Sequence, residues 1–286
     1  MTDILRIAVQ KSGRLSDDSL KLIKECGIRF DNGAGKLRAP AANFPAEILF
    51  LRDDDIPGYV EDGVAHLGIV GENVAVETGR AVETVHRLGF SKCRLSIGIP
   101  RGEPYESIKD LDGKSIATSY PRILGKYLQE NGVDAQIHEI SGSVEIAPSI
   151  GLAEAVCDIV SSGSTLLSNG LQEVETIFRS EAVMIASRNL TPAQQSLLDQ
   201  LLFRINSVQA AKNHKYILLN CPTGSVEEVS RYLPGMRSPT VMPLASEGWC
   251  SVHSVINEND FWENIEKIRL AGAEGILVIP IEKMIL

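Results

Sequence analysis

The chain has 286 residues, of which 44% are hydrophobic and 23% are charged, the composition of an ordinary globular protein. Its 28 basic and 37 acidic residues leave a net charge of −9, and the acidic residues are spread along the whole chain. This charge argues against a general nucleic-acid binder, which needs a basic face, but it permits small phosphate-bearing ligands, because a binding site is a local arrangement of charge. The length indicates two domains, or three small ones.

Sequence signals for export, membrane insertion and zinc binding are absent. Charged residues interrupt the first 15 positions, so no signal peptide is predicted, and no stretch approaches the roughly 20 apolar residues of a membrane span. The five cysteines form no C-x-x-C pair, and the five histidines do not cluster with them. We therefore expect a reduced, cytoplasmic protein without a zinc site and without a membrane or nucleic-acid partner.

Strand and helix patterns alternate over the first 90 residues. Apolar runs of strand length are followed by helices, the first of which Ser16 or Asp17 could cap and Gly27 ends. This alternation indicates a mainly parallel sheet with helices on its faces. The predicted strands are 4–9, 47–51 and 66–70, and the predicted helices are 16–27 and 53–61.

The same alternation begins again near residue 94. The apolar run 182–186 is predicted as a strand that returns to the first sheet, and Thr191 and Pro192 have the residue types of a helix N-cap and first position. The predicted strands are 95–99, 115–117, 136–140, 158–160 and 182–186, and the helical segments are 108–114, 121–131, 144–155 and 191–212.

The last 75 residues have a different order of elements. Their pattern is βαββαβ, which is the ferredoxin-like arrangement, and the segment is long enough for a small domain. The predicted strands are 216–219, 241–243, 250–256 and 275–281, and the predicted helices are 225–233 and 259–271.

The segment 158–171 is the most informative part of the chain for function. An apolar strand ends at Asp158–Val160, a loop of serines, Gly163 and Thr165 follows, and a helix begins at Leu166. A helix N-terminus beside glycine and hydroxyl groups suits a phosphate, and Asp158 is placed to bind ribose hydroxyls. A Ser/Thr-capped turn without a ligand is the alternative, and there is no Walker A motif.

Basic residues follow two of the predicted strands. Lys11, Gly13 and Arg14 follow the first strand, where two cations around a glycine could meet a polyphosphate or form a solvated turn. Arg52 follows the second and is open as a phosphate or base contact. The next three residues, 53–55, are carboxylates that could hold Mg²⁺ through water, but a favourable negative helix N-terminus is the preferred interpretation for the first two.

Two further strand ends carry glycine, hydroxyl or acidic groups. Gly71 and Glu72 end one strand, and Ser119 and Tyr120 end another. Each is an ordinary turn by itself, but together the strand-end loops surround one possible cleft between two α/β lobes. No residue has the sequence context of a catalytic nucleophile or base, so a reaction here need not use a covalent intermediate.

These segments resemble the long form of ATP phosphoribosyltransferase, the first enzyme of histidine biosynthesis. The resemblance covers nearly the whole chain, and so many motifs in one order make it specific. The extra Ser12 in the first motif fits the long form. His66 stands where the family usually has Asp, which puts one acidic contact in doubt, and a surface position is its simplest interpretation. The matching motifs are 11–15, 52–57, 67–72, 88–95, 116–121, 142–148, 158–165, 234–240 and 272–278.

The resemblance implies an α/β fold with three domains. Two lobes like those of type II periplasmic binding proteins would form the catalytic region, with residues 1–90 and 181–208 in domain I and 91–180 in domain II. Residues 211–286 would form an ACT- or PII-like βαββαβ domain that binds histidine as a feedback inhibitor. Family members are dimers that can assemble into hexamers, so a homo-oligomer is expected.

The resemblance also implies the reaction. The phosphoribosyl group of phosphoribosyl pyrophosphate is transferred to N1 of the ATP adenine with inversion, and pyrophosphate leaves with Mg²⁺. No residue is assigned as general base or nucleophile. The donor site would include Glu145, Asp158, Ser161, Ser162, Gly163, Ser164 and Thr165. The nucleotide site would include Lys11, Gly13, Arg14, Arg52, Gly71, Glu72, Ser119 and Tyr120. The histidine site would include Asn220, Met236, Ser238 and Thr240.

Two other classes of protein share parts of this pattern. A solute-binding protein, or a nucleotide sensor joined to an amino-acid sensor, would also have a two-lobed cleft without catalysis. The absence of a signal peptide argues against a periplasmic solute binder, and the presence of the phosphate loop and the cations argues against a plain amino-acid binder. A catalytically inert regulatory paralogue is disfavoured by the intact loop at 158–165 and by Lys11 and Arg14.

Overall fold

The computed structural model describes the whole chain except residues 1–3, 32, 34–35, 162 and 234. The chain folds into two compact units, unit 1 (Met1–Leu198) and unit 2 (Asp199–Leu286). The division falls inside the long helix α6 (Pro192–Ala211). Unit 1 contains two sheets, which define lobe I and lobe II, and unit 2 contains one sheet.

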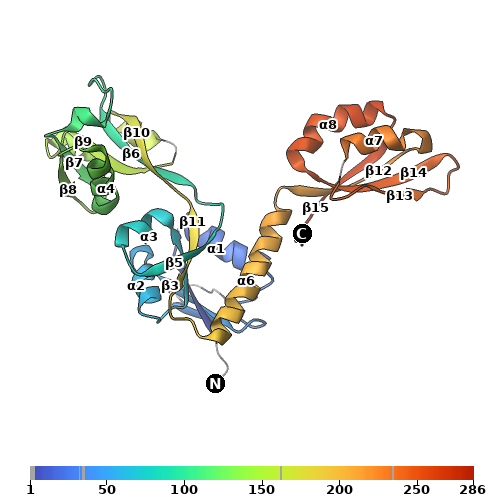
Figure 1. Ribbon diagram of the computed structural model, residues 1–286, viewed down its shortest axis with the longest axis horizontal. Coiled ribbons are helices and arrows are strands. Elements are labelled where there is room, and N and C mark those ends of the chain that lie inside the picture. The colour runs from blue at the N-terminus through green and yellow to red at the C-terminus, as the bar shows by residue number, and fades with distance from the viewer. Residues whose placement is uncertain (1–3, 32, 34–35, 162, 234) are drawn as a thin grey trace. The chain divides into compact units, whose positions relative to one another are not determined.

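Lobe I is built on a six-stranded sheet. Its elements are β1 (Leu5–Gln10), β2 (Arg38–Pro40), β3 (Ala46–Leu51), β4 (Leu67–Gly71), β5 (Val82–Arg87), β11 (Ala182–Ser187), α1 (Arg14–Glu25), α2 (Ile56–Glu61) and α3 (Glu72–Thr78). The strand order is β2-β3-β1-β4-β11-β5. β1 is parallel to β3 and to β4, so the carboxyl ends of these three strands meet at one edge of the sheet. Figure 1 labels β3, β5 and β11 of this sheet. β11 runs antiparallel between β4 and β5, which confirms the predicted return of the chain to the first sheet.

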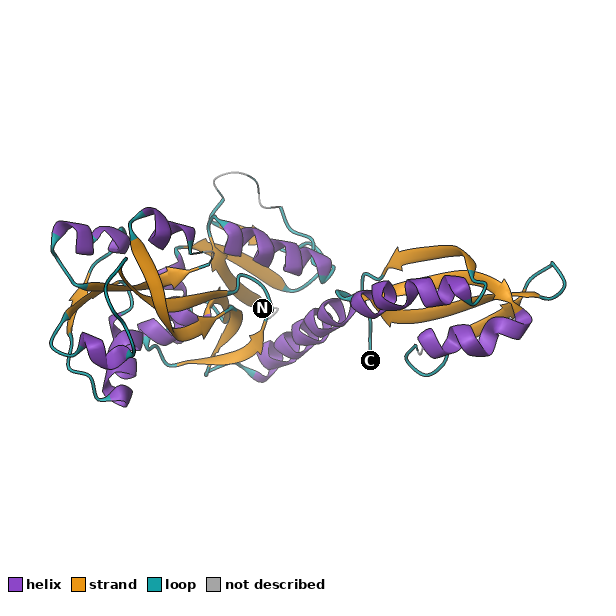
Figure 2. Ribbon diagram, turned by 90° about the horizontal axis from the view of Figure 1, so that it is seen from above, coloured by secondary structure: helices purple, strands orange, loops and turns teal. Residues whose placement is uncertain are grey.

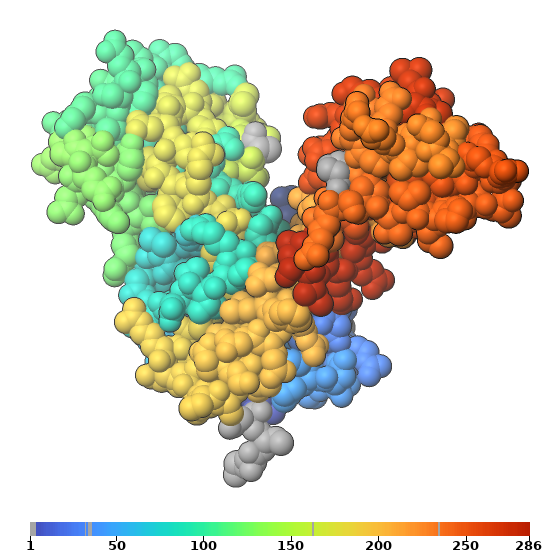
Figure 3. All heavy atoms as spheres, turned by 45° about the vertical axis from the view of Figure 1, so that its right-hand side comes forward, coloured from blue at the N-terminus to red at the C-terminus, as the bar shows by residue number. Residues whose placement is uncertain are grey.

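Lobe II is built on a five-stranded sheet. Its elements are β6 (Cys93–Pro100), β7 (Ser115–Thr118), β8 (Gln136–Glu139), β9 (Ala155–Val160), β10 (Leu171–Ser180), α4 (Pro121–Asn131) and α5 (Ser164–Ser168). The strand order is β10-β6-β9-β7-β8. β7 is parallel to β8 and β9, so their carboxyl ends also share one edge. The long strand β10 pairs antiparallel with β6, and its yellow spheres pack against the green spheres of this lobe in Figure 3.

Two short crossings connect the lobes. The first leads from β5 to β6 and the second from β10 to β11. They are paired with each other, because the N–H of Leu88 donates to Ala182 O and the N–H of Ala182 donates to Phe90 O, both at 2.9 Å. Ser91 in the first crossing has a positive φ of 49°. A paired double crossing of this kind joins two lobes that each have their own core.

The cores of the lobes are formed by apolar strands covered by helices. In lobe I, Ile56 and Val60 of α2 pack with residues of β1, β4 and β11. This approach depends on Gly68 in β4, because a Cβ there would lie 2.5 Å from Cγ2 of Ile56. In lobe II, buried residues of β6, β7 and β9 pack against Ile123, Leu124 and the rest of one face of α4. Continuous burial of the parallel strands explains their apolar sequences.

Unit 2 has the predicted βαββαβ order. Its elements are β12 (His214–Pro222), β13 (Thr240–Pro243), β14 (Trp249–Asn257), β15 (Glu274–Pro280), α7 (Val226–Tyr232) and α8 (Glu258–Leu270). The sheet is antiparallel with the order β13-β14-β12-β15, as in ferredoxin-like domains. Both helices lie on one face of this sheet (Figure 2), and Phe261 and Ile268 of α8 are buried against it.

Two local predictions were wrong. α1 begins at Arg14, with Gly13 in a positive-φ conformation before it, so Ser16 and Asp17 lie inside the first turns and do not cap the helix. The segment 144–155 is not a continuous helix, because two short 3-10 turns at 144–146 and 148–150 end at Gly151, whose φ is 74°.

The N-cap of α6 follows the prediction. Gln194 N–H donates to the Thr191 hydroxyl at 3.2 Å, and Gln194 Oε1 accepts from Thr191 N–H at 2.9 Å, so the pair forms a reciprocal capping box. Over the residues with a described position, no helix has the length and apolar character needed to cross a membrane.

Candidate functional site

Positively charged groups gather at the carboxyl edge of the lobe I sheet. Lys11 and Arg14 follow β1, Arg52 follows β3, and all three side chains are exposed. The N–H of Lys11 donates to Leu51 O at 2.8 Å, which ties the first loop to the end of β3. Gly13 has a φ of 96°, and no side chain caps α1 there. The N-terminus of this 12-residue helix therefore presents amide groups and positive dipole beside these cations.

Gly71 and Glu72 lie at the same edge, at the junction of β4 and α3. The Glu72 carboxylate accepts hydrogen bonds from the Arg87 guanidinium on β5, one of them at 2.9 Å. Arg87 also contacts Glu181 at 3.2 Å. The charge of Glu72 is thus balanced by the Arg87 guanidinium. These contacts favour a structural role for Glu72 at this edge.

The second set of predicted residues lies at the carboxyl edge of the lobe II sheet. Ser119 and Tyr120 follow β7, Glu145 lies in the segment after β8, and Asp158 lies near the end of β9. The Ser119 hydroxyl donates to Ile140 O at 2.7 Å, so it joins the loops that follow β7 and β8. The edge that parallel strands share thus brings together Ser119, Tyr120 and Asp158, as their positions near strand ends predicted. Glu145, which only the family resemblance implied, lies in the segment after β8.

The loop after β9 surrounds the N-terminus of α5. Gly163 precedes α5 with a φ of 80°, and no side chain caps the helix. Ser161, Ser164 and Thr165 are exposed, and Ser162 lies outside the described residues. The first-turn amides have no acceptor within the helix, so exposed hydroxyls and amide donors occur together here, which is the chemistry that a phosphate requires.

Arg94 is a cation at this loop that the sequence patterns did not single out. Its guanidinium donates to both carboxylate oxygens of Glu173 on β10, at 2.5 and 2.6 Å, and to Ser161 O at 3.4 Å. These hydrogen bonds lower the pKa of Glu173. Arg94 falls in the motif 88–95, but only strand pairing shows that it supports the loop.

The edges of the two lobes meet at Asn73 and Tyr120. Asn73 in α3 donates from Nδ2 to the Tyr120 hydroxyl oxygen at 3.3 Å. Asn73 is buried and held by Ser180, whose hydroxyl donates to Asn73 Oδ1 at 2.7 Å and accepts from Asn73 N–H at 3.1 Å. The sequence gives no signal for this contact, because its partners are 47 residues apart and belong to different lobes.

Acidic groups surround Tyr120 and shape its protonation. Burial raises the pKa of the Tyr120 hydroxyl, and the charges of Asp158 and Asp54 raise it further, so the phenol keeps its proton at neutral pH. Burial also raises the pKa of Asp158, and the charge of Glu145 adds to this effect. Glu145 and Asp158 are therefore electrostatic neighbours, and a bound cation or sugar hydroxyls would relieve their repulsion.

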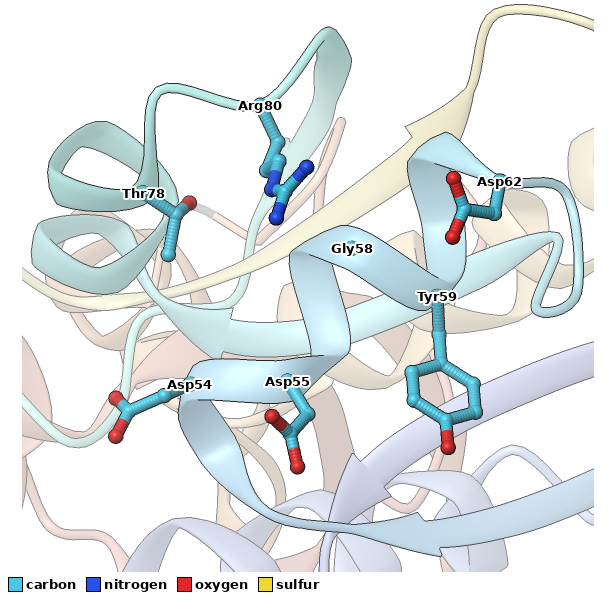
Figure 4. Close-up of a pocket in the computed structure, with 7 residues that line it drawn as sticks. All are labelled: Asp54, Asp55, Gly58, Tyr59, Asp62, Thr78 and Arg80. Atoms are coloured by element: carbon cyan, nitrogen blue, oxygen red, sulfur yellow. The ribbon is translucent and has the colours of Figure 1, made fainter.

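A cavity of about 410 Å³ lies in lobe I beside the turn that follows β3 (Figure 4). Asp54 and Asp55, two of the carboxylates considered for Mg²⁺, line it, but none of the residues predicted for the donor, nucleotide or histidine sites does. Its arginine, Arg80, is paired with Glu61 at 3.0 Å, so the remaining charge of the lining is negative and unsuited to a polyphosphate. Within the described ranges, no three histidine, cysteine or carboxylate groups assemble as a metal site. The lining residues are Asp54, Asp55, Gly58, Tyr59, Asp62, Thr78 and Arg80.

The residues predicted to bind histidine lie in unit 2 on two sides of β14. Asn220 is in β12 and pairs with Ser251, whereas Thr240 begins β13 and pairs with His253. Because β14 lies between their strands, the two residues are separated by about 10 Å across the sheet. Met236 and Ser238 are exposed in the loop that precedes β13. The structure thus places the four residues in one domain without bringing Asn220 against Thr240.

His66 is buried, which corrects the interpretation of this residue as a surface position. Its Nδ1 accepts from the N–H of Arg6 at 2.9 Å, and its Nε2 lies 3.0 Å from the Gln194 amide nitrogen. It precedes β4, whereas Gly71 ends that strand, so five strand residues of about 3.3 Å each separate His66 from the edge with the candidate site. The histidine is a packed structural residue.

Comparison with known proteins connects this architecture to one family. The family model described as ATP phosphoribosyltransferase matches residues 52–207, and the model described as HisG, C-terminal domain matches residues 211–283. An ATP phosphoribosyltransferase of Cytophaga hutchinsonii is 61% identical over 285 residues and covers 100% of both chains. Its counterpart in Bacteroides fragilis is 54% identical over 283 residues, covering 99% of this chain and 100% of that protein.

Solved structures agree with the fold. A chain of the ATP phosphoribosyl transferase complex from Thermotoga maritima superposes with a TM-score of 0.59 at 26% identity, covering 71% of this chain and 99% of that chain. A periplasmic sulfonate-binding protein from Methylobacillus flagellatus reaches 0.51 at 15% identity over 71% of this chain and 67% of that one, which shows a shared fold alone. The chain belongs to the ATP phosphoribosyltransferase family in its long form, and the enzyme transfers a phosphoribosyl group to ATP in the first step of histidine biosynthesis.

Proposed function

We propose that the two lobes of unit 1 divide the substrates of this transferase between them. The phosphoribosyl donor would bind at the loop 161–165 of lobe II, and ATP would bind at the cations of lobe I. The observation that supports this assignment is the contact of Asn73 with Tyr120, because these residues follow the carboxyl ends of parallel strands in the two sheets. Ligands of open α/β sheets bind at such edges.

The two edges have the charges that the two substrates need. Lys11, Arg14, Arg52 and the N-terminus of α1 would neutralise the triphosphate, and the loop before α5 would hold the 5-phosphate of the donor. The adenine N1 has a lone pair and attacks without a base. The transfer passes through a cation-like sugar, so alignment and charge placement are the main requirements.

The carboxylates of lobe II would face the reacting sugar. Burial is the main cause of the raised pKa of Asp158, and the charge of Glu145 adds to it, so this pair of carboxylates suits ribose hydroxyls or the Mg²⁺ that accompanies pyrophosphate. Two carboxylates with substrate phosphates are the common environment of Mg²⁺, which prefers oxygen ligands and retains water. The ion would neutralise the leaving pyrophosphate, while Asp158 would keep the ribose in place.

We further propose the domain division expected from the sequence, with 1–90 and 181–208 as domain I, 91–180 as domain II and 211–286 as a regulatory domain that binds histidine. The ferredoxin-like sheet of unit 2 supports the last assignment, and Asn220, Met236, Ser238 and Thr240 remain the predicted contacts. A homo-oligomer, as dimer and hexamer, is proposed by resemblance. The apolar residues of edge strand β15 support it, since Leu277, Val278 and Ile279 are each at least 42% exposed.

The catalytic assignment is tested by product formation. The full chain with ATP, phosphoribosyl pyrophosphate and Mg²⁺ is expected to yield phosphoribosyl-ATP, detected by mass spectrometry. A folded protein that binds both substrates and gives no product would contradict the assignment.

The donor loop is tested by Gly163→Ala combined with Thr165→Ala. We expect weaker donor binding in calorimetry with little change in ATP binding, because the loop belongs to lobe II. Ser168→Ala, which removes an exposed hydroxyl at the other end of α5, is the matched control. Equal donor affinity in wild type and double variant would refute the loop assignment.

The regulatory assignment is tested by deletion of residues 211–286. The shortened chain is expected to lose inhibition by histidine, because its proposed binding residues are removed. Inhibition that persists in the shortened enzyme would place the histidine site elsewhere.

A further inference from the structure

The end of α3 in lobe I contacts the first turn of α4 in lobe II. The Glu77 carboxylate accepts two backbone hydrogen bonds, from Arg122 N–H to Oε1 at 2.8 Å and from Ile123 N–H to Oε2 at 3.0 Å. α4 has no capping side chain of its own, since its N-cap residue Tyr120 makes no such hydrogen bond. Glu77 thus performs the capping of α4 from the opposite lobe.

A second close approach lies beside this cap. Gly79 ends α3 with a φ of 59°, and a Cβ at this position would lie 2.3 Å from Cζ of Arg122. The Arg122 guanidinium therefore packs on the bare backbone of Gly79. In addition to this packing, α3 makes three hydrogen bonds with residues 120–123 of lobe II, one from Asn73 and two to Glu77.

These contacts depend on the relative position of the lobes. Within each lobe the strands and helices would remain paired if the lobes moved about their two crossings, but the carboxylate of Glu77 would lose both of its amide donors. Hydrogen bonds to a charged acceptor are among the stronger ones in proteins, because the charge shortens and strengthens them. The cap therefore stabilises this arrangement of the lobes over a more open one.

The capped turn also contains a residue of the candidate site. Tyr120 directly precedes α4, contacts Asn73, and lies within the electrostatic influence of Asp158. A change in the position of this turn would move Tyr120 and the donor edge of lobe II relative to the cations of lobe I. Transfer between substrates on separate lobes is sensitive to such a change, because a misplacement of about 1 Å can cost about a hundredfold in rate.

We propose that Glu77 is a positioning residue of the phosphoribosyl transfer, which holds the donor edge of lobe II at reacting distance from lobe I by capping α4 across the lobes. The inference rests on the proposed division of the substrates between the lobes. It assigns Glu77 no contact with either substrate. It predicts a selective effect on the rate of transfer, with donor binding preserved, because the donor loop belongs entirely to lobe II.

The test compares Glu77→Ala and Glu77→Gln with wild type. The alanine variant removes both acceptors and is expected to lower kcat by between about tenfold and a hundredfold, the effect of one or two hydrogen bonds to a charged group. The glutamine variant keeps one acceptor oxygen and is expected to recover part of kcat. The matched control is Glu130→Ala, which removes an exposed carboxylate from the far end of α4 and is expected to behave as wild type.

Two further measurements separate positioning from a general loss of structure. Donor affinity, measured by calorimetry with phosphoribosyl pyrophosphate alone, should be unchanged in Glu77→Ala. Spin labels can be attached to ketone-containing amino acids that replace the exposed Lys21 in α1 and Lys126 in α4. In Glu77→Ala, the distribution of distances between the two labels should become broader or shift to longer distances. If the alanine variant does not fold, donor affinity and label distances are compared between Glu77→Gln and wild type.

The proposal is overturned by unchanged kcat in both variants, by an equal loss in Glu130→Ala, or by a fall in kcat with an unaltered distance distribution. A fall in donor affinity equal to the fall in kcat would also overturn it. The division of substrates is tested separately by the donor-loop variants, so loss of that assignment is distinguishable from failure of the Glu77 inference.

Discussion

Asp53 lies directly after Arg52 in the turn that leads into α2, and among the described residues its buried Oδ1 has no hydrogen-bond partner. Burial raises the pKa of the carboxyl from 3.8 to about 6, and the charge of Asp54 adds to this effect. The folded state therefore binds the proton more tightly than the unfolded chain does. Folding carries no penalty from this group below about pH 4. The penalty grows between pH 4 and 6 and stays constant above, at no more than about 3 kcal/mol.

Replacing Asp53 with the neutral, similarly shaped asparagine removes the charge but keeps the volume. We expect Asp53→Asn to stabilise unit 1 by about 1–3 kcal/mol at pH 8 and to have little effect at pH 4, because the native carboxyl is protonated there. The exposed Asp62→Asn is the matched control, since it makes the same change in net charge near the other end of α2.

Urea unfolding can resolve the two units by their chromophores. Both tryptophans, Trp249 and Trp262, belong to unit 2, so their fluorescence should be unchanged by the substitution. The transition of unit 1 is followed by circular dichroism after subtraction of the tryptophan-reported transition. A stability gain that is equal at pH 4 and pH 8, or a loss at pH 8, would refute the account of a charge penalised by burial.

Two other substitutions test the packing and capping described above. Gly68→Ala is expected to destabilise unit 1 by about 1–3 kcal/mol, because the new methyl group would overlap Ile56 at 2.5 Å; an unchanged urea midpoint would show that α2 can move away. Thr191→Ala removes the hydroxyl of the α6 capping box and is expected to cost about 1 kcal/mol, with recovery in Thr191→Ser. Equal unfolding midpoints for the alanine and serine variants would contradict the capping role.

The alternation of strands and helices was predictable because parallel strands buried on both faces are continuously apolar. β10 was not predicted, because its sequence is not continuously apolar. It carries Glu173 and Glu175 among its apolar residues, and these charges are accommodated by Arg94 and by the hydroxyls of Tyr105 and Tyr127. Such partners come from elsewhere in lobe II, and the local sequence of β10 does not contain them.

The candidate site was predictable only where its residues follow strands. Lys11 and Arg52 could be placed at the edge of the first sheet, and the loop near Gly163 at the edge of the second, because parallel strands align their carboxyl ends. Asn73 and Glu77 could not be predicted, because their roles depend on contacts with Tyr120 and the first turn of α4, about 45 residues later and in the other lobe. His66 was misjudged for a similar reason, since its burial depends on Arg6 and Gln194.

The insertion of β11 between β4 and β5 has a consequence for biosynthesis. Within the described sheet, β5 pairs only with β11, which is made about 100 residues later, or roughly 5–20 s at ordinary rates of translation. All strands of lobe II lie between them in the sequence, so this lobe can fold while the earlier lobe still has an open edge at β4. Nascent chains that stop before residue 182 would expose that edge, and a chaperone that binds unpaired strands would find its target there.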